Sequence, residues 1–215
     1  SSKSNAVGLI SAVKGAIFEN FIIKVQKDII EKDAVIKVYP YASITVGQMG
    51  KELTDIDALS KEVAVFRSAN MSLGVAILIE LAKTTAAAFP EAEIEIVEKH
   101  HNRKVDAPSG TALMLANAIR EVRPELHTNA GRSGQCKRDR NEIGIHSIRM
   151  GNIVGIHEVI VGTKNQTITL KHEAHSRALF AEGALCAAEF LYTRGAGLYD
   201  MKSLVADEKK DTVSV

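Results

Sequence analysis

The sequence has few of the features that would support a disulfide framework, a zinc site or a membrane span. Only two of its 215 residues are cysteines, Cys136 and Cys186, and they lie far apart with no C-x-x-C spacing. Such a pair is typical of free thiols in a reducing compartment. No stretch approaches the roughly 20 apolar residues that a membrane-spanning helix needs. We therefore expect a cytoplasmic protein without membrane attachment.

An excess of charge of either sign is also missing. The chain has 27 Lys and Arg residues against 26 Asp and Glu residues, which gives a formal net charge of +1. This balance argues against a general attraction to nucleic acid or to anionic membranes. Residues 1–5 lack the pattern of a secretory signal, and we interpret them as a processed or engineered terminus.

Strand and helix patterns alternate in the first part of the chain. Apolar segments at 6–13, 34–39 and 63–68 are predicted to be strands, and apolar residues recur at helical spacing over 17–29. This alternation is typical of parallel βαβ units. A longer helix is predicted from about Ser72 to Ala88.

From residue 91 onward the pattern changes to strands joined by short turns. Helices are predicted to begin at Ser109, with Leu113, Ala116 and Ile119 on its buried stripe, and at about Arg177. We expect an α+β region whose mixed sheet has helices on one face, and a loose, charged tail over 206–215. The predicted strands are 93–101, 142–150, 153–161 and 167–174.

The apolar strand residues of this second part predict an association between subunits. They are too many for one side of a monomer to cover, so we expect the uncovered face of the sheet to pack against other copies. They are Ile143, Ile145, Ile153, Val159, Val161, Ile168 and Leu170.

The segment EKHHNRKVDAPSGTAL, residues 98–113, combines histidines, basic residues and a helix start. Strand alternation places Glu98 and His100 on the same face as the preceding isoleucines, so His100 meets the core at its rim. His101 then points to the opposite face. Because no cysteine or third histidine lies nearby, we predict no metal site here.

The helix start within this segment favours binding of an anion. Ser109 is predicted to cap the helix, and Gly110 and Thr111 open its first turn. A helix start carries unpaired N–H donors and partial positive charge, to which Lys104 adds a full charge. The pattern predicts a site for a carboxylate or phosphate, although a basic surface above an ordinary helix cap would look the same.

These residues resemble the signature E-x-H-H-x-x-K-x-D-A-P-S-G-T-A of the dihydrodipicolinate reductase family. Further segments are similar to that family in the same order, and together they cover about residues 42–203. They are SANMSLGV at 68–75, IGIHSIRMGNIVG at 143–155, HEAHSRALFAEGA at 172–184 and GLYDM at 197–201.

The resemblance implies a reductase of lysine and diaminopimelate biosynthesis. Hydride from NADH or NADPH would reduce 4-hydroxy-tetrahydrodipicolinate, a cyclic dicarboxylate, in a homotetramer. The implied fold is α/β: a shortened Rossmann-like domain over residues 1–70, to which 194–215 return, and a substrate-binding and oligomerisation domain with a mixed sheet over 71–193.

The resemblance also implies residue roles. His100 and Lys104 match the proton-donating pair. The substrate-binding set corresponds to His101, Lys104, Ser109, Gly110, Thr111 and Arg177. The cofactor-binding turns correspond to Thr45 and Gly47 in one and to Ser68, Ala69, Asn70 and Met71 in the other.

The sequence departs from the family at its nucleotide-binding turn. The glycine pattern G-x-x-G-x-M-G is replaced by LISAVKGAIF at 9–18, where only Gly15 remains. An alternative is therefore a dicarboxylate-binding or assembly protein of the same fold that has lost dinucleotide binding. A third interpretation is a cofactor-free lyase or isomerase that transfers protons through His100 and Lys104.

Overall fold

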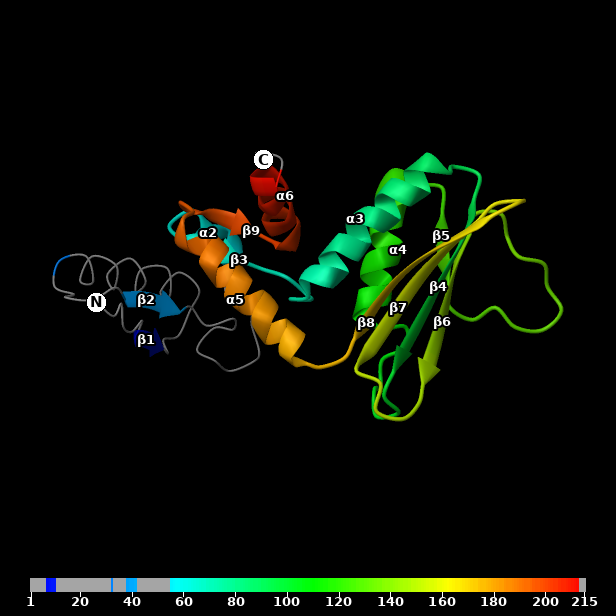
Figure 1. The fold of residues 1–215 in the computed structure, drawn as a ribbon, viewed down its shortest axis with the longest axis horizontal. Coiled ribbons are helices and arrows are strands. Elements are labelled where there is room, and N and C mark those ends of the chain that lie inside the picture. The colour runs from blue at the N-terminus through cyan, green and yellow to red at the C-terminus, as the bar shows by residue number, and fades with distance from the viewer. Residues whose placement is uncertain (1–6, 11–31, 33–37, 42–54, 213–215) are drawn as a thin grey trace. The chain divides into compact units, whose positions relative to one another are not determined.

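The computed structural model describes Val7–Ile10, Lys32, Val38–Tyr41 and residues 55–212 (Figure 1). Its contacts divide the chain into two compact units. The first contains the chain up to Arg67 together with Phe190–Tyr199. The second contains Ser68–Glu189 and the segment from Asp200 onward.

Two parallel strand pairs lie in the first unit. Strand β1 (Val7–Ile10) pairs with β2 (Val38–Tyr41), and β3 (Ala64–Phe66) pairs with β9 (Gly197–Tyr199). A short helix, α2 (Ile56–Ser60), precedes β3. Because β9 comes from near the end of the chain, its pairing with β3 joins two segments that are far apart in the sequence.

The second unit contains a mixed sheet, as the sequence predicts, but with five strands, because the short strand β5 is added to the four predicted ones. Its strand order is β5-β6-β4-β7-β8. β4, β5 and β6 are parallel, whereas β7 runs antiparallel to both of its neighbours. The strands are β4 (Glu93–His100), β5 (His127–Asn129), β6 (Glu142–Arg149), β7 (Gly155–Gly162) and β8 (Thr167–Ala174).

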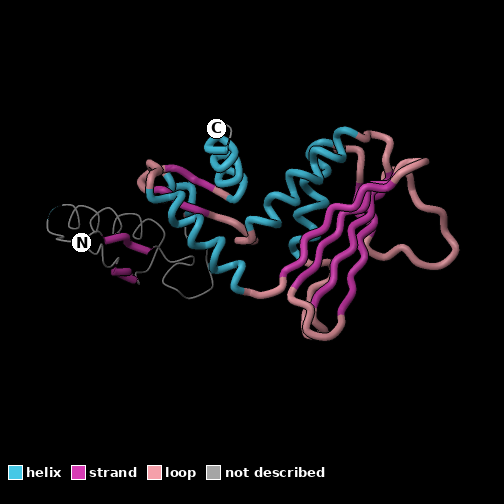
Figure 2. Tube along the Cα trace, in the orientation of Figure 1, coloured by secondary structure: helices cyan, strands magenta, loops and turns pink. Residues whose placement is uncertain are grey.

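Helices α3 (Leu73–Ala88) and α4 (Gly110–Val122) lie on the same face of this sheet (Figures 1 and 2). Each begins after a serine whose side chain accepts a backbone hydrogen bond from the first turn, Ser72 for α3 and Ser109 for α4. Capping of this kind satisfies an N–H group that has no partner within the helix. The core between helices and sheet includes Leu78, Ala82, Ile94, Ile96, Leu115, Ile119, Ile143, Ile145, Val159 and Val161.

Two local predictions are wrong. Leu113 is 42% exposed, because the buried stripe of α4 runs through Ala112, Leu115, Ala116 and Ile119. The tail is not loose up to Thr212, since residues Met201–Thr212 form helix α6. Met201, Leu204 and Val205 of α6 are buried, and they come directly before the charged segment 206–215. Helix α5 (Ala178–Tyr192) precedes β9.

The apolar strand residues do not face away from the helices as expected. Ile143, Ile145, Val159 and Val161 are at most 2% exposed and belong to the core that α3 and α4 cover. Ile168 and Leu170 pack against that core as well. The helices of the same chain therefore cover six of the seven residues from which the sequence predicts contact between subunits, while Ile153 lies half-buried before β7.

The other face of the sheet is more polar. Alternation along β4, β6 and β7 places partly buried apolar residues there, among them Val97, Ile156 and Ile160, while Ile148 is 37% exposed. No helix in the described part of the chain is long and apolar enough to cross a membrane.

Candidate active site

The candidate site forms where β4 ends. The burial of β4 alternates, so Ile94 and Ile96 enter the core and are followed on the same face by Glu98 and His100. Glu98 is fully buried and His100 is 9% exposed. The strand thus places a carboxylate and an imidazole next to each other at the rim of the core, as alternation predicts.

Glu98 is ionised and fully hydrogen-bonded. Both of its carboxylate oxygens accept from Arg149 at 2.8 and 2.7 Å, and the Ser109 amide donates to it at 3.1 Å. His100 Nδ1 lies 2.6 Å from its Oε2 atom. Burial opposes ionisation, but hydrogen bonds from Arg149, Ser147 and His100 outweigh it and lower the pKa of Glu98 to about 2.

A second histidine, His157 of β7, completes the buried part of the site. Its Nε2 lies 3.1 Å from Ser109 Oγ, and its ring meets that of His100 edge-on at 5.1 Å between centroids. Burial, followed by the neighbouring His100, lowers the pKa of His157 to about 4. His157 is therefore neutral near pH 7.

The helix start places the predicted anion-binding residues in different surroundings. Ser109 is buried, and its amide and hydroxyl are bonded to Glu98, Ala112 and His157. Gly110 is exposed with open space around it, and Thr111 is half-buried. An anion would therefore meet Gly110 and Thr111 rather than the serine.

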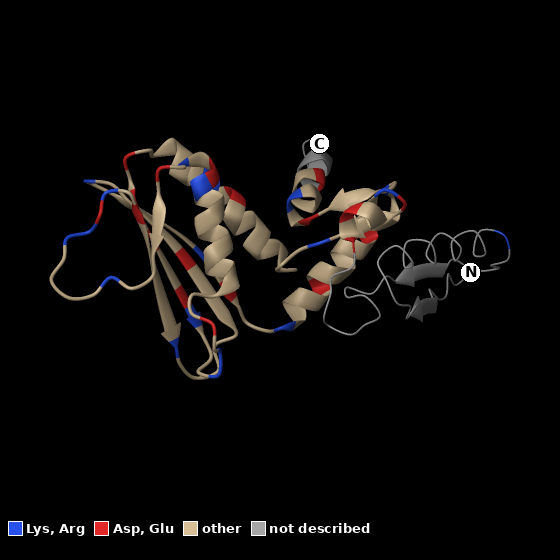
Figure 3. Ribbon diagram, turned by 180° about the vertical axis from the view of Figure 1, so that it is seen from behind, with Lys and Arg blue, Asp and Glu red and all other residues tan. Residues whose placement is uncertain are grey.

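The basic residues of the segment lie on the loop that follows β4. Lys104 Nζ forms an ion pair with Asp106 Oδ1 at 2.7 Å, and its amide donates to the His101 carbonyl at 3.1 Å. Figure 3 shows Lys and Arg residues on the loops at this end of the sheet. The sequence interpretation assigned no partner to Lys104, although Asp106 is only two residues away.

His101 is half-buried, and its Nδ1 atom is buried without a hydrogen-bond partner among the residues that the structure describes. Loss of solvent is the largest cause that lowers its pKa, and the positive charges of Arg103 and Arg177 come next. Exposed Arg177 thus acts on the loop after β4, although it follows β8 in the chain.

The second predicted cofactor turn, residues 68–71, is held by its own side chains. Ser68 Oγ donates to the Asn70 carbonyl at 2.6 Å, and Asn70 Oδ1 accepts from the Ser72 amide at 2.8 Å. Ala69 is exposed and Met71 half-buried. Asn70 Nδ2 also donates to Thr111 Oγ1 at 3.0 Å, which joins the turn to the start of α4. Thr45 and Gly47 lie outside the described residues.

A hollow of about 460 Å³ lies in the second unit. It is lined by residues from the start of α3, the end of β8 and the start of α5, including Ser72, His172, His175 and Ser176. Its volume is within the range of small-molecule sites. Within the described part of the chain, no group of three His, Cys, Asp or Glu side chains is arranged to hold a metal ion.

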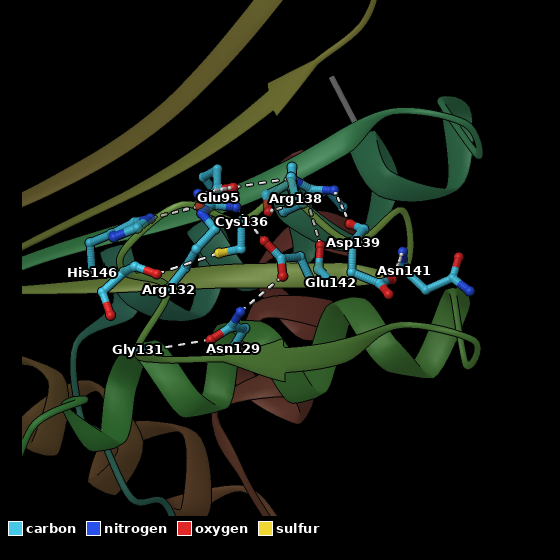
Figure 4. Close-up of polar contacts among 12 residues, drawn as sticks. Glu95, Asn129, Gly131, Arg132, Cys136, Arg138, Asp139, Asn141, Glu142 and His146 are labelled. Carbon is cyan, nitrogen blue, oxygen red and sulfur yellow. Dashed lines mark hydrogen bonds and ion pairs between the residues drawn. The ribbon is translucent and has the colours of Figure 1, made fainter.

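A separate polar cluster lies on the other face of the sheet and anchors the loop 130–141 (Figure 4). Arg132 contacts both Glu95 and Glu142, Arg138 donates to Glu95 at 3.1 Å, and His146 Nε2 lies 2.7 Å from Glu95 Oε2. A Cβ at Gly144 would meet the Glu95 carboxylate at 1.8 Å, so a side chain at this position would displace that carboxylate from its partners. The cluster holds this long loop in place, and its residues lie on the face of the sheet opposite to Glu98 and His100.

The protonation of His157 predicts a specific loss of stability in acid. Its pKa is about 4 in the folded protein, below the ordinary histidine value of 6.5. Its contribution is fully present above pH 6.5 and is lost as the pH falls toward 4, because the unfolded chain then binds the proton more readily. At 1.36 kcal/mol per pKa unit the loss is roughly 3 kcal/mol.

Urea unfolding between pH 7.5 and 4 measures this effect. We expect a His157→Gln variant to lose much of the decline in midpoint over that range, whereas His127→Gln, at an exposed position on β5, should retain it. Glu98 adds a further loss only at lower pH, between the ordinary glutamate pKa of 4.5 and the Glu98 pKa of about 2. An unaltered decline in His157→Gln would refute the buried neutral state of this ring.

The mixed sheet, the parallel strands and the cationic helix start together define an α/β protein with a candidate site for a small anionic ligand. A family model described as "Dihydrodipicolinate reductase, C-terminus" matches residues 74–205, which is more than half of the chain. The chain belongs to the dihydrodipicolinate reductase family, which confirms the resemblance seen in the sequence. A second model, described as "Dihydro-orotase-like", matches residues 15–103, less than half of the chain.

Curated relatives agree with this assignment. The chain is 49% identical over 176 residues to a 4-hydroxy-tetrahydrodipicolinate reductase of Caldanaerobacter subterraneus, which covers 81% of this chain and 70% of the relative. It is 48% identical over 168 residues to the Clostridium novyi protein of the same name, which covers 77% of this chain and 67% of that protein.

A solved structure shows the same fold. It is a dipicolinate-bound dihydrodipicolinate reductase from Paenisporosarcina sp. TG-14, which matches with a TM-score of 0.58 and 20% identity. The match covers 90% of this chain and 71% of that chain.

Proposed function

We propose that this protein is a 4-hydroxy-tetrahydrodipicolinate reductase that uses NADH or NADPH. Its family membership and relatives of that name at 44–49% identity support the proposal. In the overall reaction, the ring loses its hydroxyl and one ring hydrogen together as water, and it gains a hydride and a proton. The nicotinamide, when bound, supplies the hydride.

One observation carries the proposal. The hydrogen bond from Asn70 Nδ2 to Thr111 Oγ1, at 3.0 Å, joins the turn assigned to the nicotinamide with the helix start assigned to the dicarboxylate. Hydride transfer requires the two reactants to be held next to each other.

The described part of the nucleotide site fits the nicotinamide end of the cofactor. The turn of Ser68, Ala69, Asn70 and Met71 follows parallel strand β3, and such strand ends are where α/β sheets bind ligands. Its internal hydrogen bonds fix its shape before a ligand arrives. We assign Thr45 and Gly47 to the same end from the family motif alone.

The substrate carboxylates would bind to the cationic loop and helix start. His101, Lys104 and Arg177 supply positive charge or N–H donors, and the amides of Gly110 and Thr111 supply helix-start donors. Ser109 acts by capping the helix and so orienting those amides. A substrate carboxylate would replace Asp106 on Lys104, which is feasible because the Asp106 side chain is 57% exposed.

His100 and Lys104 are proposed to supply the proton. A histidine suits this task because one ring nitrogen can transfer a proton while a hydrogen bond holds the other. Lys104 adds a positive charge at the reacting ring, where it stabilises negative charge that develops during the reaction.

Fluorescence titrations with NADH and NADPH, each with and without pyridine-2,6-dicarboxylate, test the proposal together with a turnover assay. Saturable quenching that strengthens with the dicarboxylate, and oxidation of either dinucleotide with substrate, are expected. Dicarboxylate binding without any dinucleotide signal would favour the alternative of a binding or assembly protein.

Arg177 provides a specific prediction. If its guanidinium binds a substrate carboxylate, Arg177→Ala should raise KM about tenfold or more, because a charge-assisted hydrogen bond contributes roughly 1.5–3 kcal/mol. The kcat value should change less. Arg140→Ala, which removes an exposed arginine paired with Glu91 elsewhere on the unit, is the matched control. Equal KM values for the two variants would show that Arg177 does not bind the substrate.

We also propose a cytoplasmic homotetramer with a nucleotide-binding domain over residues 1–70 and 194–215 and a substrate domain over 71–193. These functional bounds differ from the contact units, which group the segment from Asp200 onward with Ser68–Glu189. The sheet face with Val97, Ile148, Ile156 and Ile160 is the surface proposed to pack between subunits. Light scattering at micromolar concentration should give four times the mass of the 23.2 kDa chain. A stable monomer would contradict the tetramer.

A further inference from the structure

Glu98 has more hydrogen-bond partners than are required to compensate its buried charge. A bidentate pair with Arg149 would suffice, yet the carboxylate also accepts from the Ser109 amide and contacts His100 Nδ1 at 2.6 Å. The contact with His100 is as short as a charge-assisted hydrogen bond. Glu98 therefore links the candidate proton donor to a rigid ionic pair.

This geometry determines which nitrogen of His100 carries the proton. An ionised carboxylate only accepts hydrogen bonds, so Nδ1 must be the donor in the contact with Glu98. The nitrogen that gains or loses a proton is then Nε2. A Cβ at Gly155 would lie 3.2 Å from Nε2, so glycine on β7 keeps that side of the ring uncrowded.

The same guanidinium also holds the loop that carries Lys104. Arg149 Nη2 donates to the Asp106 carbonyl at 2.6 Å in addition to its contact with Glu98. Since Lys104 lies two residues before Asp106, one arginine fixes both the strand end with His100 and the loop with Lys104. This arrangement couples the positions of the two residues proposed to supply the proton.

We propose that Glu98, held by Arg149, is a positioning residue that keeps a proton on His100 Nδ1, so that Nε2 is the nitrogen that takes up the second proton and donates it. The catalytic consequence rests on the proposed reductase function. The protonation state of the ring does not. A pair of this kind provides orientation and the correct tautomer without itself exchanging a proton with the substrate.

The tautomer can be measured in the parent protein by ¹⁵N NMR with labelled histidine. The chain has seven histidines, and loss of one ring signal set in His100→Gln assigns His100. At a pH where the ring is neutral, we expect the pattern of a protonated Nδ1 and an unprotonated Nε2, which is the less common form of free histidine. A protonated Nε2 would overturn the proposal even if the enzyme is fully active.

A Glu98→Gln variant tests the catalytic consequence. The amide keeps the size of the side chain but removes the acceptor charge, so we expect the His100 signals to change form and kcat to fall about 100-fold or more, with a smaller change in KM. Glu158→Gln is the matched control, since it removes a carboxylate on neighbouring β7 whose partner is Lys99. It should leave both the tautomer and kcat unchanged.

Two other results with Glu98→Gln would contradict the proposal. A normal kcat in Glu98→Gln, or a low kcat with an unaltered His100 tautomer, would contradict the positioning role. If Glu98→Gln does not fold, Arg149→Lys retains the positive charge but loses the bidentate contact, and the same two readouts are expected to change to a lesser degree. Absence of reductase activity in the parent protein would refute the proposed function while the NMR result still tests the tautomer.

Discussion

A His100→Gln variant is expected to lose kcat by about 10² to 10⁴-fold, with a smaller change in KM. Glutamine keeps hydrogen-bonding capacity next to Glu98 but cannot donate a proton readily near neutral pH. Steady-state oxidation of NADH or NADPH with substrate measures the loss. The variant should bind pyridine-2,6-dicarboxylate nearly as well as the parent, because the proposed carboxylate donors lie on His101, Lys104, Arg177 and the helix start.

The matched control is His146→Gln. His146 lies on the adjacent strand β6 but on the other face of the sheet, where it contacts Glu95. Its replacement should leave kcat close to the parent value. If His100→Gln turns over at the parent rate, the ring is a structural part of the rim and the catalytic assignment is wrong.

A Lys104→Ala variant is expected to lower kcat/KM by about 10² to 10³-fold, which corresponds to roughly 3–4 kcal/mol of transition-state stabilisation. The loss has two sources, since the ammonium is proposed both to bind a carboxylate and to act at the reacting ring. The dissociation constant of the dinucleotide should change little. Fluorescence titration and initial-rate kinetics separate the two effects.

Lys99→Ala is the corresponding control, because Lys99 pairs with Glu158 on the other face of the sheet and should tolerate replacement. The double variant with His100→Gln should lose less than the product of the two single losses, because both residues act on one transition state. Fully multiplicative losses would indicate that the two side chains act in separate steps.

Local sequence patterns predicted the parts of the site that depend on neighbours along the chain. Alternation over 93–100 placed Glu98 and His100 on the buried face, because side chains on a strand point to opposite faces in turn. The helix start at Ser109 was predicted from its capping chemistry and is confirmed by the bond from the Ala112 amide. Helix α4 shows the limit of such patterns, since Leu113 was assigned to the wrong stripe.

The partners of these residues lie on other strands, whose order in the sheet could not be predicted from the sequence. Arg149 and His157 lie about 50 residues beyond Glu98 and Ser109, respectively, and reach them because β6 and β7 flank the strand β4. A signal was present, since a glutamate on a buried strand face requires a cationic or donor partner. The chain has 27 Lys and Arg residues from which that partner would have to be chosen.

The sequence by itself determined the family, the strand face of His100 and the helix start, because a long local motif, strand alternation and capping each depend on residues close together in the chain. Only the tertiary structure decided that Arg149 pairs with Glu98, that Asn70 bonds Thr111, and that helices cover the apolar rows of the sheet. Strand order and register select which distant side chains meet, and hydrophobic periodicity gives the buried face of a strand without naming what covers it.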